Sequence, residues 1–351
     1  MSGKKIYFMY CCCDNNYIWF VHQKINALMR IGMTDKHVEY IANFPIDYAN
    51  GANFYFGAMV DYEERIFFIP NLYNSILVFN KATREFENVE LLDNYKKNAY
   101  GMFRYGYKSD NCIICIPSGF SKIISFDINS FDYTVLLNWK ELKKEYEVSH
   151  ISDFAYNSKT IALLVKPSNE VILFNIATQE IKIISPYGPE GLITSIEILN
   201  ENIYLYNELD KSIDIINVGN LKKEKICTEF DDVCYLYRIN DYFLMVDLIY
   251  REQAAIIDEY GKVVWKYGDN LKLEEYSYFH IGYNPNDAVE LIYYNNVSNE
   301  LIYINLDEMK HTSIPVFCEN KEFESVKRIK AKCLCEDEYI TLNDFISSIV
   351  K

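Results

Sequence analysis

The chain has 351 residues, of which 50% are hydrophobic and 16% aromatic, with only 13 Gly and 8 Pro. This composition excludes a disordered or low-complexity chain and is ample for a folded core. Lys and Arg number 35 against 50 Asp and Glu, and the resulting net charge of −15 argues against nucleic acids and anionic membranes as partners.

The N-terminal segment carries two lysines but a short apolar run and no small-residue cleavage site, so we expect no secretory signal. No stretch reaches the roughly 18 consecutive apolar residues that a membrane-spanning helix needs. Ten cysteines in a chain without a signal indicate a reducing compartment. We therefore expect an acidic, cytoplasmic protein whose thiols act as small apolar side chains.

Short runs of β-branched and aromatic residues, each closed by Asn or Asp, recur along the chain and predict strands. The residues before these closing positions are numbers 79, 126, 174, 216, 257 and 304, so the steps are 47, 48, 42, 41 and 47 residues. A period of about 40–50 residues built from strand signals is typical of the blades of a β-propeller.

Each period predicts four strands separated by polar turns. In the second unit we expect strands at 56–61, 66–70, 76–79 and 85–91, and in the fourth unit at 151–156, 161–165, 171–174 and 180–184. The turn before the last strand repeats as Asn80–Glu85 and Asn175–Glu180. Its Asn can accept hydrogen bonds from the backbone two residues on, which favours a tight reversal.

Seven such units fit the chain, so we predict an all-β, seven-bladed β-propeller over residues 1–318. The units are expected at 4–45, 51–92, 99–140, 149–186, 192–229, 233–268 and 277–317. Six blades with an N-terminal extension, or eight blades using the tail, also fit. In residues 319–351 we expect an edge strand or connector and then a short C-terminal helix, because Leu342, Phe345, Ile346 and Ile349 share one helical face.

The turns Asn80–Glu85 and Asn175–Glu180, with Gly261–Lys266, resemble those of bacterial propellers of the quinoprotein-like and surface-layer-repeat kind. This resemblance implies the propeller fold and a bacterial protein, but no activity and no specific family. The Gly-His and Trp-Asp marks of WD repeats and the Gly-Gly doublets of kelch repeats are absent.

The cysteines do not form a metal-binding pattern. Cys112 and Cys115 have the spacing of a zinc knuckle, but they lie within a predicted strand, where an offset of three residues places the thiols on opposite faces. Cys333 and Cys335 would share a face, yet no second half of a site is evident. We therefore expect no metal and no cofactor, and thiols that are structural.

No catalytic constellation is evident either. The five histidines are scattered, acidic runs read as solvated surface, and no nucleophile elbow or phosphate-binding glycine loop is present. Propeller enzymes draw their catalytic groups from different blades, so the sequence cannot pair them. An enzyme stays open, but nothing in the sequence argues for one.

The 31 tyrosines suggest a binding surface, because many lie beside turns, where the chain enters the innermost strand of a blade. The leading hypothesis is a non-catalytic scaffold that presents this aromatic loop face to a protein partner. Three arginines beside strands, Arg104, Arg238 and Arg251, would make a local site for an anionic group. The candidate binding residues are Tyr55, Tyr100, Arg104, His150, Tyr235, Arg238 and Tyr278.

The alternative hypothesis is a carbohydrate- or peptide-processing enzyme with its site at the mouth of the central channel. A carboxylate converging with His150 or His280 would favour this enzyme, whereas a broad aromatic surface would favour the scaffold. A carbohydrate or a small anionic ligand is the alternative to a protein partner.

Overall fold

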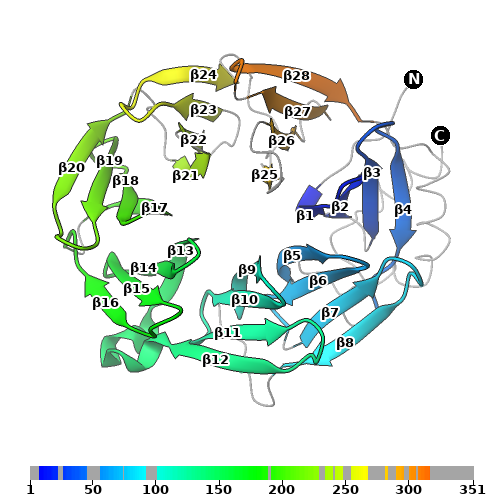
Figure 1. Ribbon diagram of the computed structural model, residues 1–351, viewed down its shortest axis with the longest axis horizontal. Helices are drawn as coiled ribbons and strands as arrows, with labels where there is room; N and C mark the ends of the chain where they lie inside the picture. The colour runs from blue at the N-terminus through cyan, green and yellow to red at the C-terminus, as the bar shows by residue number, and fades with distance from the viewer. Residues whose placement is uncertain are drawn as a thin grey trace, which may run out of the picture. The chain divides into compact units, whose positions relative to one another are not determined.

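The structure is a computed structural model, and it describes residues 8–22, 27–45, 56–73, 75–91, 101–188, 191–228, 234–239, 242–247, 254–267, 281–283, 290–295, 300–305 and 307–316. The described residues form seven antiparallel four-stranded sheets, each built from four strands that are consecutive in the chain (Figure 1). These sheets are the blades of a seven-bladed β-propeller, as the sequence predicts, and we number them 1 to 7 in chain order.

The chain divides into two compact units. Unit 1 comprises residues 1–97, 278–306 and 311–351, and it holds blades 1, 2 and 7. The strands of blade 1 are β1 (Phe8–Cys13), β2 (Tyr17–His22), β3 (Leu28–Gly32) and β4 (Val38–Ala42). Those of blade 2 are β5 (Phe56–Tyr62), β6 (Arg65–Pro70), β7 (Ser75–Asn80) and β8 (Phe86–Glu90). Those of blade 7 are β25 (Ile281–Tyr283), β26 (Glu290–Asn295), β27 (Glu300–Asn305) and β28 (Lys310–Pro315).

Unit 2 comprises residues 98–277 and 307–310, and it holds blades 3 to 6. Blade 3 contains β9 (Phe103–Ser109), β10 (Cys112–Pro117), β11 (Lys122–Asp127) and β12 (Tyr133–Asn138). Blade 4 contains β13 (His150–Tyr156), β14 (Thr160–Lys166), β15 (Glu170–Asn175) and β16 (Ile181–Ile184). Blade 5 contains β17 (Ile193–Leu199), β18 (Asn202–Asn207), β19 (Ser212–Asn217) and β20 (Lys223–Cys227). Blade 6 contains β21 (Cys234–Ile239), β22 (Tyr242–Asp247), β23 (Ala254–Ile257) and β24 (Val263–Tyr267).

The core of each unit lies between neighbouring blades, because the middle strands of a blade are covered on both faces. In blade 4, the five residues from Ile161 to Val165 and the four from Val171 to Phe174 are all buried, whereas three of the four residues of β16 are exposed or only partly buried. Strands buried on both faces read as continuous apolar runs, which is why the sequence repeat was visible. Separate apolar clusters join blades 7 and 1, blades 1 and 2, and each successive pair among blades 3 to 6.

The turn between the third and fourth strands recurs with the same hydrogen bonds. In blade 4, Asn175 Oδ1 accepts from the backbone N–H groups of Ala177 and Thr178 at 3.0 and 2.9 Å, and Gln179 closes the turn at φ +59°. The predicted role of this Asn is thus confirmed. The same arrangement recurs at Asn80, Asp127 and Asn217.

The first strands of blades 2 to 5 share a second repeated feature, a β-bulge near their start. In blade 4, Ile151 pairs with Val165 and Asp153 with Leu164, so Ser152 is the extra residue. A bulge bends a strand and redirects the side chains on either side of it. The extra residues in the four blades are Gly57, Arg104, Ser152 and Thr194.

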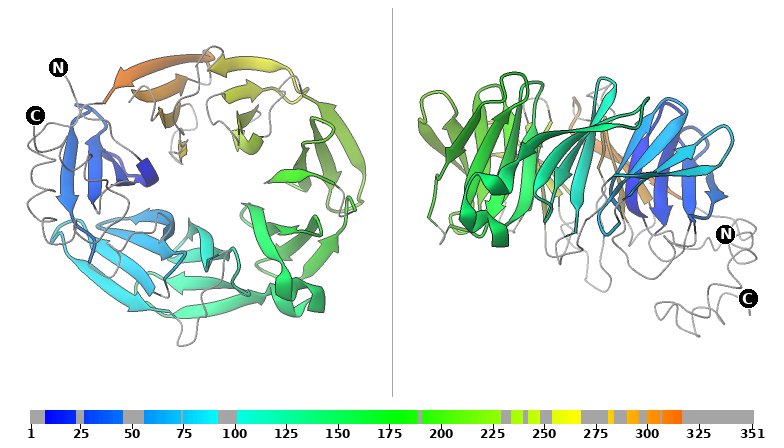
Figure 2. Two further views of the ribbon diagram at one scale, coloured as in Figure 1. Left: turned by 180° about the vertical axis from the view of Figure 1, so that it is seen from behind. Right: turned by 90° about the horizontal axis from the view of Figure 1, so that it is seen from below.

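Two short 3₁₀ turns, η2 (Trp139–Glu141) and η3 (Lys144–Val148), join blade 3 to blade 4, and the sequence did not predict them. They lie beside blade 4 (Figure 1, Figure 2). The carboxylate of Glu170 in β15 holds them there, because it accepts hydrogen bonds from Tyr146 at 2.7 Å and from the Lys143 ammonium group. The buried ring of Trp139 donates from Nε1 to the carbonyl of Phe120 at 2.8 Å.

The expected boundaries of all seven units agree with the blades to within a few residues at each end. The predicted C-terminal helix, like the rest of residues 319–351, lies outside the described residues. In the described part of the chain, no helix has the length and apolar character that crossing a membrane would require.

Candidate functional site

Two of the seven predicted binding residues, Arg104 and His150, have described side chains. Tyr235 and Arg238 are the second and fifth residues of β21, and their side chains are outside the described set, as are Tyr55, Tyr100 and Tyr278 altogether. The site is therefore built from Arg104, from His150 and from the residues around them in unit 2.

One loop, residues 118–121 between β10 and β11, brings together the segments that carry these side chains. The N–H of Ser118 donates to the carbonyl of Met102, and its own carbonyl accepts from the N–H of Ile151 at 2.9 Å. The N–H of Trp139 donates to the carbonyl of Ser121 at 3.0 Å. The loop is thus bonded to the chain just before Arg104, just before Lys140 and just after His150.

Arg104 is the extra residue of the bulge in β9, and it is partly buried. Its guanidinium carbon lies 5.5 Å from the centre of the Tyr105 ring, within reach of a cation–π interaction. Its positive charge acts on two groups of blade 4: it adds to the lowering of the His150 pKa that burial causes, and it opposes the rise of the Asp153 pKa that burial causes.

His150 begins β13 and pairs directly across the strands with Lys166, the last residue of β14. Partial burial lowers the pKa of the His150 imidazole below its ordinary 6.5, and the charges of Arg104, Lys166 and Lys140 lower it further. Both effects disfavour the imidazolium, so the ring is held neutral at physiological pH. We call these four residues, Arg104, Lys140, His150 and Lys166, the cationic cluster.

The two lysines of the cationic cluster sit in partly buried positions. The ammonium group of Lys166 donates to the side-chain oxygen of Asn169, and that of Lys140 donates to the carbonyl of Glu147 at 3.4 Å. Burial lowers the pKa of both lysines. The negative charge of Glu147 raises the pKa of Lys140, and that of Glu208 raises the pKa of Lys166, but the net shift of both remains downward. The cluster is therefore a region of positive charge in a protein of net charge −15.

A buried polar chain lies beside the cationic cluster and links three blades. The carboxylate of Asp153 in β13 accepts the Ser195 hydroxyl hydrogen at 2.7 Å and the N–H of Ile196 at 2.9 Å. Ser195 Oγ in turn accepts the N–H of Leu236 in β21 at 3.0 Å. Burial raises the pKa of Asp153, although these hydrogen bonds and Arg104 act in the opposite direction.

Aromatic side chains fill the seam between the first strands of blades 3 and 4. The rings of Tyr105 and Phe154 lie 4.4 Å apart, and those of Tyr107 and Tyr156 stack at 3.5 Å with only 10° between their planes. Tyr156 is 45% exposed. Tyr156 is the last residue of β13 and His150 the first, so this stack lies at the other end of the strand from the predicted entry-loop surface.

The position of Asp153 bears on the enzyme hypothesis, which a carboxylate converging with His150 would favour. Asp153 is three residues from His150, but its carboxylate turns away to Ser195 and Ile196 of blade 5 and is buried there. Among the described residues, no group of three or more His, Cys, Asp or Glu side chains could hold a metal ion. Strand β10 runs unbroken from Cys112 to Pro117, so Cys112 and Cys115 project to opposite faces, as predicted.

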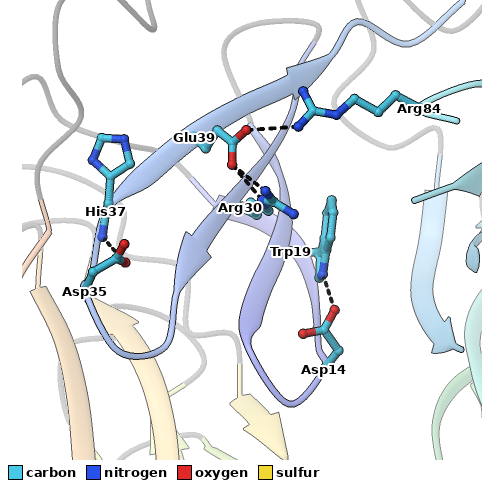
Figure 3. Close-up of polar contacts among 7 residues, drawn as sticks. All are labelled: Asp14, Trp19, Arg30, Asp35, His37, Glu39 and Arg84. Carbon is cyan, nitrogen blue, oxygen red and sulfur yellow. Dashed lines mark hydrogen bonds and ion pairs between the residues drawn. The ribbon is translucent and has the colours of Figure 1, made fainter. Parts of the chain in front are cut away.

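A second polar cluster, in unit 1, is engaged within itself (Figure 3). Trp19 Nε1 donates to Asp14 Oδ2 at 2.7 Å, and Arg30 binds Glu39 at 2.6 Å. Arg84, from the turn of blade 2, reaches the other oxygen of Glu39 at 3.2 Å. The first two contacts lie within blade 1 and the third joins blade 2 to it, so we assign these side chains a structural role.

No protein-family model and no curated protein sequence matches the chain. Solved structures do resemble it. PorZ, a bacterial surface component of the type-IX secretion system of Porphyromonas gingivalis, aligns with a TM-score of 0.60 and 12% identity over 89% of this chain. The alignment covers 39% of PorZ, so this chain spans about two fifths of that protein.

Two further structures match over most of their own length. YCF48 bound to D1 peptide aligns with a TM-score of 0.60 and 9% identity, covering 83% of this chain and 89% of YCF48. A catalytically inactive virginiamycin B lyase from Staphylococcus aureus, with quinupristin, aligns with a TM-score of 0.60 and 11% identity, covering 84% and 94%. At these identities the likenesses show the β-propeller fold and no narrower family.

Proposed function

We propose that this chain is a non-catalytic binding scaffold that presents the loops flanking the first strands of its blades to a protein partner. The observation that carries the proposal is the convergence of Arg104 and His150, from different blades, on the loop of residues 118–121. Distant positions that repeat along a chain and meet beside one loop are the way a propeller builds a binding surface.

Two further observations support binding rather than catalysis. Asp153 lies three residues from His150, and its carboxylate accepts hydrogen bonds from Ser195 and Ile196 of blade 5. The structural neighbour YCF48 carries a bound peptide, so a propeller with similar geometry can hold a peptide.

The proposed setting is the cytoplasm. The described cysteines, which are Cys11, Cys12, Cys13, Cys112, Cys115 and Cys227, carry free thiols, and free thiols are typical of a reducing compartment.

The test is affinity capture with the purified chain as bait, in extract of the source cells, followed by quantitative mass spectrometry. The wild-type bait is compared with Arg104→Glu and with Lys159→Glu, a matched charge reversal at an exposed turn of blade 4. We expect a protein retained by the wild type and by Lys159→Glu but lost with Arg104→Glu. That protein is then made recombinantly and its Kd measured against all three baits.

Equal retention by all three baits, with confirmed direct binding, would place the partner surface elsewhere on the chain. Turnover of a peptide or glycan by the purified chain, lost in His150→Gln, would contradict the non-catalytic assignment.

A further inference from the structure

The geometry points to a ligand class for the cationic cluster: we propose that Arg104, Lys140, His150 and Lys166 bind the carboxylate groups of a short acidic peptide segment. This inference rests on the proposed function, because it names the chemistry by which the scaffold would recognise a protein partner. It concerns four side chains from β9, η2, β13 and β14.

The positions of the three cations, Arg104, Lys140 and Lys166, around the neutral His150 ring are set by the backbone and not by mutual attraction, since like charges repel. Hydrogen bonds from the loop of residues 118–121 hold the segments of Arg104, Lys140 and His150, and the antiparallel pairing of β13 with β14 sets Lys166 opposite His150. A cluster of like charges that the backbone holds in place is preorganised to bind an ion of opposite charge. The free energy needed to bring the charges together has already been supplied by folding.

The partners that the lysines have in the structure leave their charge largely unbalanced. Lys166 donates to a neutral amide, and Lys140 donates to a backbone carbonyl at 3.4 Å. Glu147 and Glu208 act on Lys140 and Lys166 respectively, but neither of these two described residues forms an ion pair with its lysine. Positive charge in a partly buried position without an ion pair is unfavourable, and a bound carboxylate would offset it. The pKa of both lysines is lowered by burial, which agrees with an ammonium charge that its surroundings do not fully stabilise.

The overall charge limits the size of the anion. A net charge of −15 repels long polyanions, whereas a peptide with two or three acidic side chains brings little charge beyond what the cluster can neutralise. The cations also come from separate elements, so they suit carboxylates spread along a peptide better than charge concentrated at one phosphate. The planar guanidinium of Arg104 has a shape that matches a carboxylate, whereas the lysines act as point charges.

The test uses the purified full chain and three capped tetrapeptides: Gly-Glu-Glu-Gly, its uncharged counterpart Gly-Gln-Gln-Gly, and Gly-phosphoserine-Gly-Gly. Binding is followed by NMR through the imidazole C–H signals of His150, which are assigned by their loss in His150→Gln. We expect a saturable shift with the glutamate peptide and none with the glutamine peptide. We also expect the pKa of His150 to rise when the glutamate peptide is bound.

Two neutralising variants and a matched control make the assignment specific. Arg104→Gln and Lys166→Gln should each weaken glutamate-peptide binding about tenfold or more, the usual effect of losing a charged hydrogen bond. Lys159→Gln, at the other end of β14 and exposed, should change it less than about twofold. Unchanged circular dichroism and melting temperature show that the variants remain folded, and Arg104→Gln tests the site without altering the Lys166–Asn169 contact.

The inference is overturned if the glutamine peptide produces the same shift, if both neutralising variants bind like the wild type, or if only the phosphoserine peptide binds. Its failure is distinguishable from failure of the scaffold proposal. If wild type, Arg104→Gln and Lys166→Gln all capture the same partner equally, the carboxylate-site proposal is contradicted and the scaffold proposal is supported. If the glutamate peptide binds but no protein partner is captured, the scaffold proposal is contradicted and the carboxylate-site proposal is supported.

Discussion

The carboxylate of Asp153 and the hydroxyl of Ser195 form a 2.7 Å hydrogen bond between the first strands of blades 4 and 5. Both residues follow the bulge of their own strand, so equivalent positions in successive blades are directly bonded. Ser195 continues the chain to the backbone N–H of Leu236 in blade 6. In unit 2, the position after the bulge thus supplies polar contacts that join blade 4 to blade 5 and blade 5 to blade 6.

Removing this contact should destabilise unit 2. We expect Asp153→Ala to lower the free energy of unfolding by about 2–4 kcal/mol, because it leaves the donors of Ser195 and Ile196 without an acceptor in a buried site. Urea denaturation measures the change. In a double-mutant cycle with Ser195→Ala, a coupling of about 0.5–3 kcal/mol is expected for residues in contact. Strictly additive effects would show that the bond does not couple the blades.

The ionisation of Asp153 makes the stability of the fold depend on pH. Burial raises the pKa of this carboxyl in the folded state, so its contribution is fully present below the unfolded value of 3.8 and is lost as the pH rises through the folded pKa. The stability of the wild type relative to Asp153→Asn should therefore increase as the pH falls from 7 toward 4. Paired urea denaturation curves at several pH values test this. A difference that is constant with pH, or that falls toward pH 4, contradicts the assignment.

The imidazole of His150 should titrate below 6.5 in the ligand-free protein, because burial and three nearby cations disfavour its charged form. NMR titration of its C–H signals measures the pKa directly. We expect Arg104→Gln and Lys166→Gln to raise that pKa, with the larger effect from Arg104→Gln, and Lys159→Gln to leave it unchanged. A His150 pKa that is the same in all four proteins would show that the cationic cluster does not converge on this ring.

The turn of blade 4 offers a test of the repeated Asn. Asn175→Ala should cost about 1 kcal/mol of unfolding free energy, because two backbone N–H groups lose their side-chain acceptor. Asn175→Asp retains an acceptor at the same place and should cost distinctly less. Thermal and urea denaturation compare the two variants. Equal losses would mean that the side-chain oxygen does not stabilise the turn.

Thiol reactivity should follow burial. Burial raises the pKa of Cys12 and Cys115 well above its ordinary value, so little nucleophilic thiolate forms at these positions near pH 8. Cys227 is exposed. Native-state alkylation, followed by peptide mass spectrometry over time, should modify Cys227 first and reach Cys115 only on denaturation. Cys115 reacting as fast as Cys227 would show that the core of blade 3 opens readily.

The sequence by itself determined the period, the strands and the turns, because these depend on neighbouring residues. Alternating and continuous apolar runs reveal which strands are buried, and an Asn such as Asn175 forms its turn from local hydrogen bonds. For the same reason, the unit boundaries were predicted to within a few residues. Arg104 was selected as a cation beside an expected strand, and His150 because it lies where the chain enters the first strand of a blade.

Only the tertiary structure decided what these residues meet. Counted back from its hairpin turn, β14 would pair Lys166 with Ile151, but the bulge at Ser152 shifts the register by one residue and sets Lys166 opposite His150. Asp153 and Ser195, which are joined by a hydrogen bond, are 42 residues apart in the sequence. A bulge changes which side chain occupies a face without leaving a mark in the apolar pattern, and contacts between blades depend on packing that no local segment encodes.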